Sequence, residues 1–391
     1  MNFATVQLTG AQQAFIDDVR AVLEAHWSPD PTAIAMDHER MPEGLRRAIA
    51  DRGWLRPTAP VAEGGGGLDP LEARLLELLL DAYLVPTGGD TLIVSVVPAI
   101  QAFGSDELTR TVLPQLASGH ATVCLGYSEP DCGSDMGAVR TRAVQRPDGD
   151  WVIDGAKMWT SFGHESDYVF LLTRTGAPED RKRGLTMFLV PMDSPGVEWR
   201  PVQGMARVRT NIVFFSNVVV PDTHRLGEVG GGWEVLSAPL AAEHGRDGQA
   251  DPYADINGVM GTMFSRTLER LVEHTAVWAM TPAGPDGSRP IDDEHLELAL
   301  ADALLDVELC RGAPGEMGKP LSAEALLRHA DALADLTAPF GVLDHGAVGA
   351  AAAGVVSEAR LHAPATKIYG GTSEIYRNNI AAGELGLPRP Y

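Results

Sequence analysis

The order in which helical and strand patterns follow one another constrains the fold of this chain most. Residues 1–120 show helical spacing, and Thr9 and Gln12 stand as a capping box ahead of the first helix. From residue 121, short β-branched and aromatic runs follow one another closely between turn residues, as strands do. Helical spacing returns after Gly230–Gly232 and continues to Ile380. Because no helices separate the strands, an antiparallel barrel or sandwich is expected instead of a βαβ sheet.

The sequence thus predicts an α+β multidomain protein. Its parts are an N-terminal helical domain (1–120), a central antiparallel β-barrel or sandwich domain (121–230) and a C-terminal helical bundle (231–391). The clearest strands are expected at Ala121–Tyr127, Trp151–Ile153, Asp167–Arg174, Gly184–Pro191 and Asn211–Val220. Within the bundle, Thr281–Asp293 is rich in Pro, Gly and Asp and predicts a loop, whereas Ala351–Ala353 are expected on a long helix.

Charge and cysteine content exclude several classes of protein. The 391-residue chain has a formal net charge of −22, whereas nucleic acids and anionic membranes bind basic surfaces. Its three cysteines lie far apart without a CxxC pair, which argues against a disulfide scaffold or a metal site. Met1–Arg20 lacks a signal-peptide pattern, and no apolar run reaches the roughly 18 residues of a membrane span. We expect a cytoplasmic protein that binds neither nucleic acid nor membrane.

Local motifs, in register along nearly the whole chain, resemble those of the acyl-CoA dehydrogenase family. The segment Tyr127–Asp135 (YSEPDCGSD) is similar to the family's T/S-E-P-x-x-G-S-D, and Gly155–Ser161 (GAKMWTS) to its G-x-K-x-W-I-T. Further matches are Val218–Trp233, at the end of the β domain, and the C-terminal runs Tyr369–Ile375 and Leu385–Arg389. The resemblance implies that the last domain is a four-helix bundle.

The same resemblance implies non-covalent FAD and α,β-dehydrogenation of an acyl-CoA thioester. A flavin needs an aromatic or apolar wall and backbone donors around its ring. The cofactor contacts that the family resemblance implies are Leu125, Tyr127, Ser128, Gly133, Ser134, Trp159, Thr160, Ser161, Thr372 and Glu374. Gly133 and Ser134 would also lie where the acyl-CoA enters, so Ser134 is a candidate substrate contact.

The base of the reaction departs from the commonest pattern of the family. Much of the family has Glu just before the Gly-Thr of the C-terminal motif, but here Gly370 stands there. A subgroup that includes isovaleryl-CoA dehydrogenase carries its Glu on the first long helix of the last bundle, which corresponds to Glu243. Glu243 is therefore the candidate base, and the Gly370 backbone N–H a candidate donor to the thioester oxygen. His244 follows where the family usually has Arg, so His244 and Arg246 are candidate substrate contacts.

A second departure concerns the neighbour-subunit contact. After the Thr281 loop, many relatives have a basic residue that reaches the FAD diphosphate of another subunit, but here the segment 292–297 (DDEHLE) is acidic. Arg266 or Arg270 would have to supply that charge, or FAD binding is weakened.

Three hypotheses about the assembly and the reaction stay open. The first is a homotetramer, a dimer of dimers that passes electrons to an electron-transfer flavoprotein. The second is a partner subunit of a heterotetrameric acyl-CoA dehydrogenase with an incomplete site. The third is a flavin oxidase or monooxygenase on the same fold.

Overall fold

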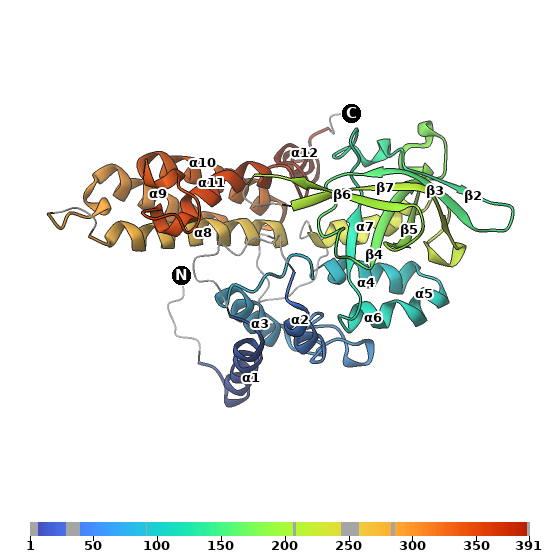
Figure 1. The fold of residues 1–391 in the computed structure, drawn as a ribbon, viewed down its shortest axis with the longest axis horizontal. Helices are drawn as coiled ribbons and strands as arrows, with labels where there is room; N and C mark the ends of the chain where they lie inside the picture. Colours follow the sequence, from blue (N-terminus) through green and yellow to red (C-terminus); the bar gives the residue numbers. More distant parts are fainter. Residues whose placement is uncertain are drawn as a thin grey trace.

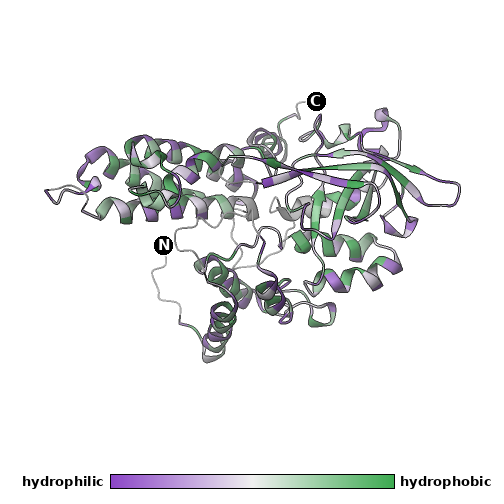
Figure 2. Ribbon diagram, viewed as in Figure 1, coloured by the Kyte–Doolittle hydropathy of each residue, from purple (hydrophilic) through white to green (hydrophobic). Residues whose placement is uncertain are grey.

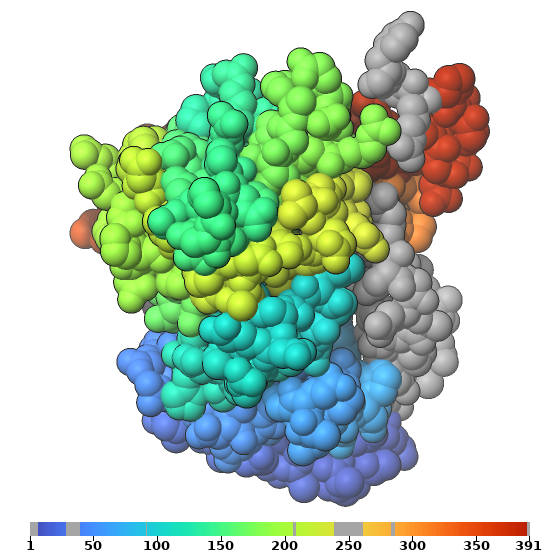
Figure 3. Space-filling model, turned by 90° about the vertical axis from the view of Figure 1, so that its right-hand side faces the viewer, coloured from blue at the N-terminus to red at the C-terminus, as the bar shows by residue number. Residues whose placement is uncertain are grey.

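The computed structural model describes residues 7–28, 40–90, 92–205, 209–243, 258–282 and 286–388, with side chains except at 238–243 and 258–260. Helices, a sheet and again helices follow one another along the chain (Figure 1), which confirms the predicted α+β architecture. Figure 3, turned by 90°, shows the N-terminal helices (blue to cyan) at the bottom and the strands (green) above them. None of the described helices is long and apolar enough to cross a membrane.

The N-terminal helices begin at the local signals that the sequence provides. They are α1 (Gly10–His26), α2 (Glu43–Ala50), α3 (Pro70–Ala82), α4 (Leu92–Phe103), α5 (Asp106–Thr111) and α6 (Leu113–Ala117). The predicted capping box of α1 is present: Gln12 N donates to Thr9 Oγ1 at 3.2 Å, and Thr9 N donates to Gln12 Oε1 at 2.9 Å. Helix α3 has a second capping box, between Asp69 and Glu72, with proline at its first position.

The central part is one eight-stranded sheet in the order β6-β7-β3-β2-β4-β5-β8, with β1 also paired to β4. The strands are β1 (Val123–Gly126), β2 (Arg142–Gln145), β3 (Trp151–Lys157), β4 (Tyr168–Arg174), β5 (Leu185–Pro191), β6 (Val197–Gln203), β7 (Arg209–Val220) and β8 (Arg225–Leu226). The predicted strands are all present. The sheet does not close into a barrel, and β1–β4 and β2–β4 are parallel pairs in an otherwise antiparallel arrangement.

The sheet has a narrow junction between two halves. Strands β6, β7, β3 and β2 form one half, and β4, β5 and β8, with β1, form the other. In the strand pairing, the two halves are joined by a single residue pair, Arg142 opposite Arg174, beside which Arg174 N donates to the Thr141 carbonyl at 2.7 Å. The Arg174 guanidinium, which is buried, reinforces this place by donating to the carbonyls of Gly137 at 2.6 Å and Val139 at 2.7 Å.

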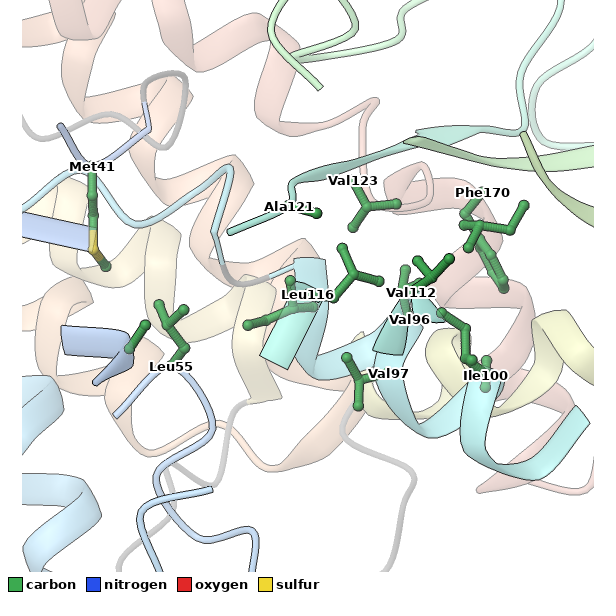
Figure 4. Packing of buried hydrophobic residues seen from close by; sticks show 14 of the residues in the cluster. Met41, Leu55, Val96, Val97, Ile100, Val112, Leu116, Ala121, Val123 and Phe170 are labelled. Carbon is green, nitrogen blue, oxygen red and sulfur yellow. The ribbon is translucent and has the colours of Figure 1, made fainter. Parts of the chain in front are cut away.

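One hydrophobic core joins the N-terminal helices to the sheet. Figure 4 shows Val96, Val97 and Ile100 of α4 facing Val123 of β1 and Phe170 of β4. A separate core is built by both halves of the sheet, with Ile153 and Phe215 from one half and Phe188 from the other. Figure 2 shows the hydrophobic colour along the inner strands and the hydrophilic colour at the β2–β3 turn, as expected for a half-buried sheet.

The C-terminal helices form the third part. They are α7 (Gly232–Glu243), α8 (Gly258–Met280), α9 (Glu294–Arg311), α10 (Gly318–Leu336), α11 (Val355–Thr366) and α12 (Ser373–Gly383). Helix α7 packs against α4 and β5, and α8 to α11 enclose a core of their own. Helices α8 and α10 come so close at Gly261 that a Cβ there would lie 2.8 Å from the carbonyl carbon of Gly318. Only glycine therefore fits at this position.

Two expectations for the bundle had different outcomes. The predicted loop after Thr281 is present between α8 and α9. The expected long helix at Ala351–Ala353 is wrong: Ala351–Gly354 is a short 3₁₀ segment in which Ala352 and Ala353 have φ of 48° and 56°. Gly354, itself left-handed, starts α11 there, and a Cβ on it would lie 2.4 Å from His345 Cα. Close packing of the chain on itself therefore overrides the helix propensity of alanine.

Candidate functional site

The loop after β1 is held by a buried ion pair. Lys157 Nζ, at the end of β3, donates to Glu129 Oε1 at 2.8 Å and to the Tyr127 carbonyl at 3.1 Å. The Glu129 carboxylate also accepts from the backbone N–H groups of Arg140 at 2.7 Å and Thr141 at 2.8 Å. The side chains of Lys157 and Glu129 are 0% and 6% exposed, so this pair fixes the loop from inside.

Burial and pairing act in opposite directions on these two groups. Burial lowers the pKa of Lys157 to about 8, although Glu129 acts to raise it. Burial alone would raise the pKa of Glu129, but the Lys157 charge and the hydrogen bonds to this carboxylate bring it below its usual range. Each group is therefore charged at neutral pH because the other is present.

The turn after β3 presents an exposed tryptophan. Trp159 has a φ of 63° and is 56% exposed, which is a strained conformation for a bulky residue. The turn is fixed on both sides: Met158 N donates to the Ser128 carbonyl at 2.9 Å, and Thr160 and Asn211 exchange backbone hydrogen bonds of 3.0 and 3.1 Å. The Asn211 amide adds a third bond to the Thr160 carbonyl, at 2.9 Å. The fold thus holds the Trp159 indole out of the core.

Arg40, from the N-terminal part, supports both segments from behind. Its buried guanidinium donates to the carbonyl of Val123 in β1 at 2.9 Å and to Ser166 Oγ at 2.8 Å. It also lies 4.8 Å from the ring centroid of Phe162. Burial lowers the pKa of Arg40, and Asp90 at 3.8 Å offsets part of this effect.

The structure brings most of the predicted cofactor contacts into one group around these two segments. Leu125, Tyr127, Ser128 and Ser161 are half-buried, Gly133, Ser134 and Trp159 are exposed, and Thr160 is buried. Thr160 Oγ1 is buried and has no hydrogen-bond partner among the described residues. We call this group the indole cluster. An exposed indole beside a hydroxyl that lacks a partner fits the needs of a flavin ring, which requires an apolar wall and polar contacts.

Gly370, Thr372 and Glu374 form a second group at the start of α12. Gly370 and Gly371 have φ of 63° and 89°, and Thr372 Oγ1 caps α12 by accepting from Ile375 N at 3.2 Å. The backbone N–H groups of residues 370, 371 and 372 have no acceptor in the part of the chain that the structure describes. Successive free N–H groups in a left-handed turn attract negatively charged oxygen atoms. Figure 1 shows α12 at the end of the bundle that faces the sheet.

The candidate base, Glu243, is the last described residue of helix α7. Helix α7 runs through Pro239 without interruption and ends at Glu243, whose side chain is outside the described part. His244 and Arg246 lie outside the described residues altogether. Within the described ranges, no group of three or more His, Cys, Asp or Glu side chains could hold a metal ion.

The acidic segment 292–297 has a local explanation. Asp292 pairs with Arg289 at 2.8 Å, and Asp293 Oδ1 caps α9 by accepting from His295 N at 2.9 Å. Acidic residues at a helix N-terminus are favourable. The two arginines considered as replacements bind α3 instead: Arg266 pairs with Glu77 at 3.0 Å, and Arg270 pairs with Asp81.

Sequence reasoning did not predict the buried charges that support the two groups. Glu129 and Lys157 stand inside the two motifs quoted above, so an ion pair between them could have been predicted from the sequence. Arg40 stands outside every motif, as does Lys319 of α10, whose ammonium group donates to the Gly371 carbonyl, and no local pattern marks either residue.

Comparisons with known proteins agree with the motifs. Residues 9–120 match the acyl-CoA dehydrogenase N-terminal domain, and residues 124–218 match the acyl-CoA dehydrogenase middle domain. The chain is 32% identical over 362 residues to acyl-CoA dehydrogenase FadE26 of Mycobacterium tuberculosis, covering 86% of each protein. It is 35% identical over 311 residues to acyl-CoA dehydrogenase IpdE1 of the same organism, covering 75% of this chain and 74% of that protein.

The fold comparison gives the same result. The crystal structure of the ChsE4-ChsE5 complex from Mycobacterium tuberculosis matches with a TM-score of 0.80 and 27% identity, over 99% of this chain and 100% of the matched chain. The motifs, the two domain matches and the identity to these relatives lead to one conclusion: the chain belongs to the acyl-CoA dehydrogenase family and is an FAD-dependent oxidoreductase.

Proposed function

We propose that this enzyme oxidises the Cα–Cβ bond of its acyl-CoA thioester with Glu243 as the base. Bound FAD supplies the hydride acceptor, at flavin N5. Glu243 would take the α-proton from the end of α7, a helix whose packing against α4 and β5 gives it a fixed place. Glycine at position 370 leaves the alternative base position without a carboxylate. A dry pocket around the acyl chain would raise the pKa of Glu243 and so make it a stronger base.

The observation that carries this proposal is the set of free N–H groups at residues 370–372. Removal of the α-proton moves negative charge onto the thioester oxygen, and fixed N–H donors stabilise such charge. Gly370 N–H would donate to that oxygen, while Thr372 and Glu374 contact the cofactor. The indole cluster would form the other wall of the cofactor site, with Trp159 over the flavin and Ser134 at the acyl-CoA entrance. His244 and Arg246 would meet the substrate beyond α7.

Replacement of the base tests the proposal directly. The purified chain, with any partner that co-purifies, is mixed without oxygen with a panel of straight, branched and bulky acyl-CoA esters, and flavin absorbance is followed. Glu243→Gln should keep its FAD and lose bleaching by at least about 100-fold, since proton abstraction is worth this much. Glu234→Gln, at an exposed position in the first turn of the same helix, is the matched control. Equal loss in both variants, or undiminished bleaching in Glu243→Gln, contradicts the assignment.

A heteromeric assembly is favoured over a homotetramer by the outer face of α9. This helix exposes four leucines, Leu298, Leu304, Leu305 and Leu309, each more than half exposed. Its exposed acidic residues are Glu294, Glu297, Asp302 and Glu308. Two copies that met through α9 would bring like charges together, whereas a different chain with a basic rim would not. The structural relative that is a ChsE4-ChsE5 complex is consistent with this proposal.

The assembly and the electron acceptor are measurable together. The chain expressed alone should show a smaller mass by light scattering than the same chain co-expressed with a second acyl-CoA dehydrogenase subunit, and a stable homotetramer would contradict the proposal. We infer an electron-transfer flavoprotein as the electron acceptor. Rapid reoxidation of the bleached flavin by oxygen would instead identify an oxidase or monooxygenase.

We also infer a cytoplasmic location, where the thiols of Cys124, Cys132 and Cys310 stay reduced. We further propose that the three domains meet at residues 120/121 and 230/231.

A further inference from the structure

Lys319 is a buried cation that touches the proposed thioester-binding turn. It is the second residue of α10 and its side chain is 1% exposed. Its ammonium group donates to the carbonyl oxygen of Gly371 and lies 5.4 Å from the ring centroid of Tyr376 in α12. The close approach of α8 and α10 at Gly261 fixes the backbone from which this side chain extends, since a Cβ there would lie 3.1 Å from Lys319 N.

This cation has little compensation for its burial. Within the described residues, no carboxylate lies within 4.0 Å of Lys319 Nζ, and Glu374 and Glu324 act on it only from a greater distance. Burial lowers the pKa of Lys319 to about 8. A buried ammonium group without a paired carboxylate is costly, so its single strong contact, the Gly371 carbonyl, needs an explanation.

The turn that Lys319 contacts is poorly held by its own backbone. On one side, Tyr369 N donates to the Ala365 carbonyl at 3.2 Å, and on the other, Ser373 N donates to the Lys367 carbonyl at 3.0 Å. Between them stand two left-handed glycines, which have the greatest conformational freedom of any residue, and three N–H groups without an acceptor in the described part of the chain. The Lys319 contact falls in the middle of this unsupported stretch.

We propose that Lys319 is a positioning residue for the Gly370–Thr372 turn. Its hydrogen bond to the Gly371 carbonyl holds the turn in the left-handed conformation that points the N–H groups away from the bundle and toward the substrate and cofactor. The same bond polarises the peptide group between Gly371 and Thr372, so that Thr372 N–H becomes a stronger donor. This role deepens the proposed function and rests on it, since the turn is assigned there to the thioester oxygen.

Two variants with the same change in charge separate positioning from a general electrostatic effect. Lys319→Met removes the buried ammonium group and keeps most of the volume, and Lys367→Met removes a half-buried lysine next to the turn while the Lys367 carbonyl keeps its bond to Ser373. With an acyl-CoA ester that bleaches the wild-type holoenzyme, Lys319→Met should lower kcat by about 10- to 100-fold, because misplacing a catalytic group by about 1 Å costs up to about 100-fold and losing an oxyanion donor costs more. KM should change by less than about threefold, and Lys367→Met should match the wild type in both constants.

A second measurement does not depend on catalysis. Amide hydrogen exchange across residues 372–380 should be at least about tenfold faster in Lys319→Met than in the wild type or Lys367→Met, because the start of α12 loses its anchor to α10. Unchanged exchange, or equal acceleration in both variants, overturns the positioning role. If the wild-type holoenzyme bleaches with no ester while exchange responds as expected, the proposed reaction is refuted and the positioning of the turn stands.

Discussion

Breaking the buried ion pair between Lys157 and Glu129 gives the sharpest test of how the indole cluster is built. The perturbations are Glu129→Gln, Lys157→Met and the double variant. In the wild type the two charged atoms are 2.8 Å apart, and each single change leaves one buried charge without its counter-charge. Removing one member of a buried pair costs about 3–5 kcal/mol, because the remaining charge must stay desolvated or take up or lose a proton.

The double variant should behave differently from the sum of the two singles. It contains no unpaired charge. The remaining losses are one acceptor for the Arg140 and Thr141 N–H groups, since a glutamine offers one carbonyl oxygen where Glu129 offers two, and the Lys157 donor to the Tyr127 carbonyl. A buried N–H without an acceptor costs about 1–3 kcal/mol. The double variant is therefore expected to lose about 1–3 kcal/mol, which is less than either single variant.

Urea unfolding followed by tryptophan fluorescence is the assay, because Trp151, Trp159 and Trp199 all lie in the sheet part of the chain. FAD retention after gel filtration provides a second readout, since both the Tyr127 carbonyl and the loop that carries Ser134 depend on the pair. If the two single losses in free energy of unfolding simply add in the double variant, the two side chains are not coupled, and the ion pair does not hold the loop after β1.

Three further predictions address other parts of the molecule. Trp159→Ala should change the free energy of unfolding by no more than about 0.5 kcal/mol, because the indole is 56% exposed, yet weaken FAD binding at least about tenfold in a fluorescence titration; unchanged affinity would remove Trp159 from the cofactor site. Arg40→Met should cost about 3 kcal/mol in urea unfolding, since the buried Asp90 keeps only the Arg46 cation, at 3.9 Å, and the Val123 carbonyl loses its donor; a loss below about 1 kcal/mol would contradict this. Burial raises the pKa of Asp306, but His329 and Arg328 outweigh it and hold this pKa below 3.8, so the stability from the carboxylate is present above pH 3.8 and is lost as pH falls through the lowered pKa. Asp306→Asn should therefore be less stable than the wild type by about 1–3 kcal/mol near pH 6 and should converge with it near pH 2; a constant difference would show that ionisation is not involved.

The parts of the fold that the sequence predicted are those with local signals. Helices α1 and α3 are marked by side chains that cap them within three residues, at Thr9 and Asp69. Strand β6 escaped prediction because it is an edge strand, largely exposed and interrupted by Pro201, and so has no alternating pattern. The parallel pairing of β1 with β4 depends on contacts between residues about 45 positions apart, as Val123 and Tyr168 are, which no local pattern encodes.

The same distinction applies to the site. The cofactor contacts were expected because they stand in short contiguous motifs, and their roles remain predictions until FAD binding is measured. The supporting charges were missed because their contacts are distant in sequence: Lys319 lies 52 residues from Gly371, and Arg40 lies 126 residues from Ser166. A buried lysine or arginine looks like any other charged residue until the chain brings its acceptor to it.

The junction in the sheet, where Arg142 faces Arg174, separates the strands that carry the two segments of the indole cluster, which we propose to bind the flavin. Tyr127 and Ser128 continue from β1, in one half of the sheet, whereas Trp159 and Thr160 continue from β3, in the other. A buried core packs the two halves against each other, with the rings of Trp151 in β3 and Phe188 in β5 5.4 Å apart, and near the indole cluster the bonds of Lys157 to Glu129 and of Met158 to Ser128 link the two segments directly. Loss of these bonds should therefore loosen the proposed flavin site locally, while the shared core keeps the two halves together. The spacing between Ser128 and Trp159, and with it the proposed grip on the flavin ring, therefore depends on side chains that would never touch the cofactor.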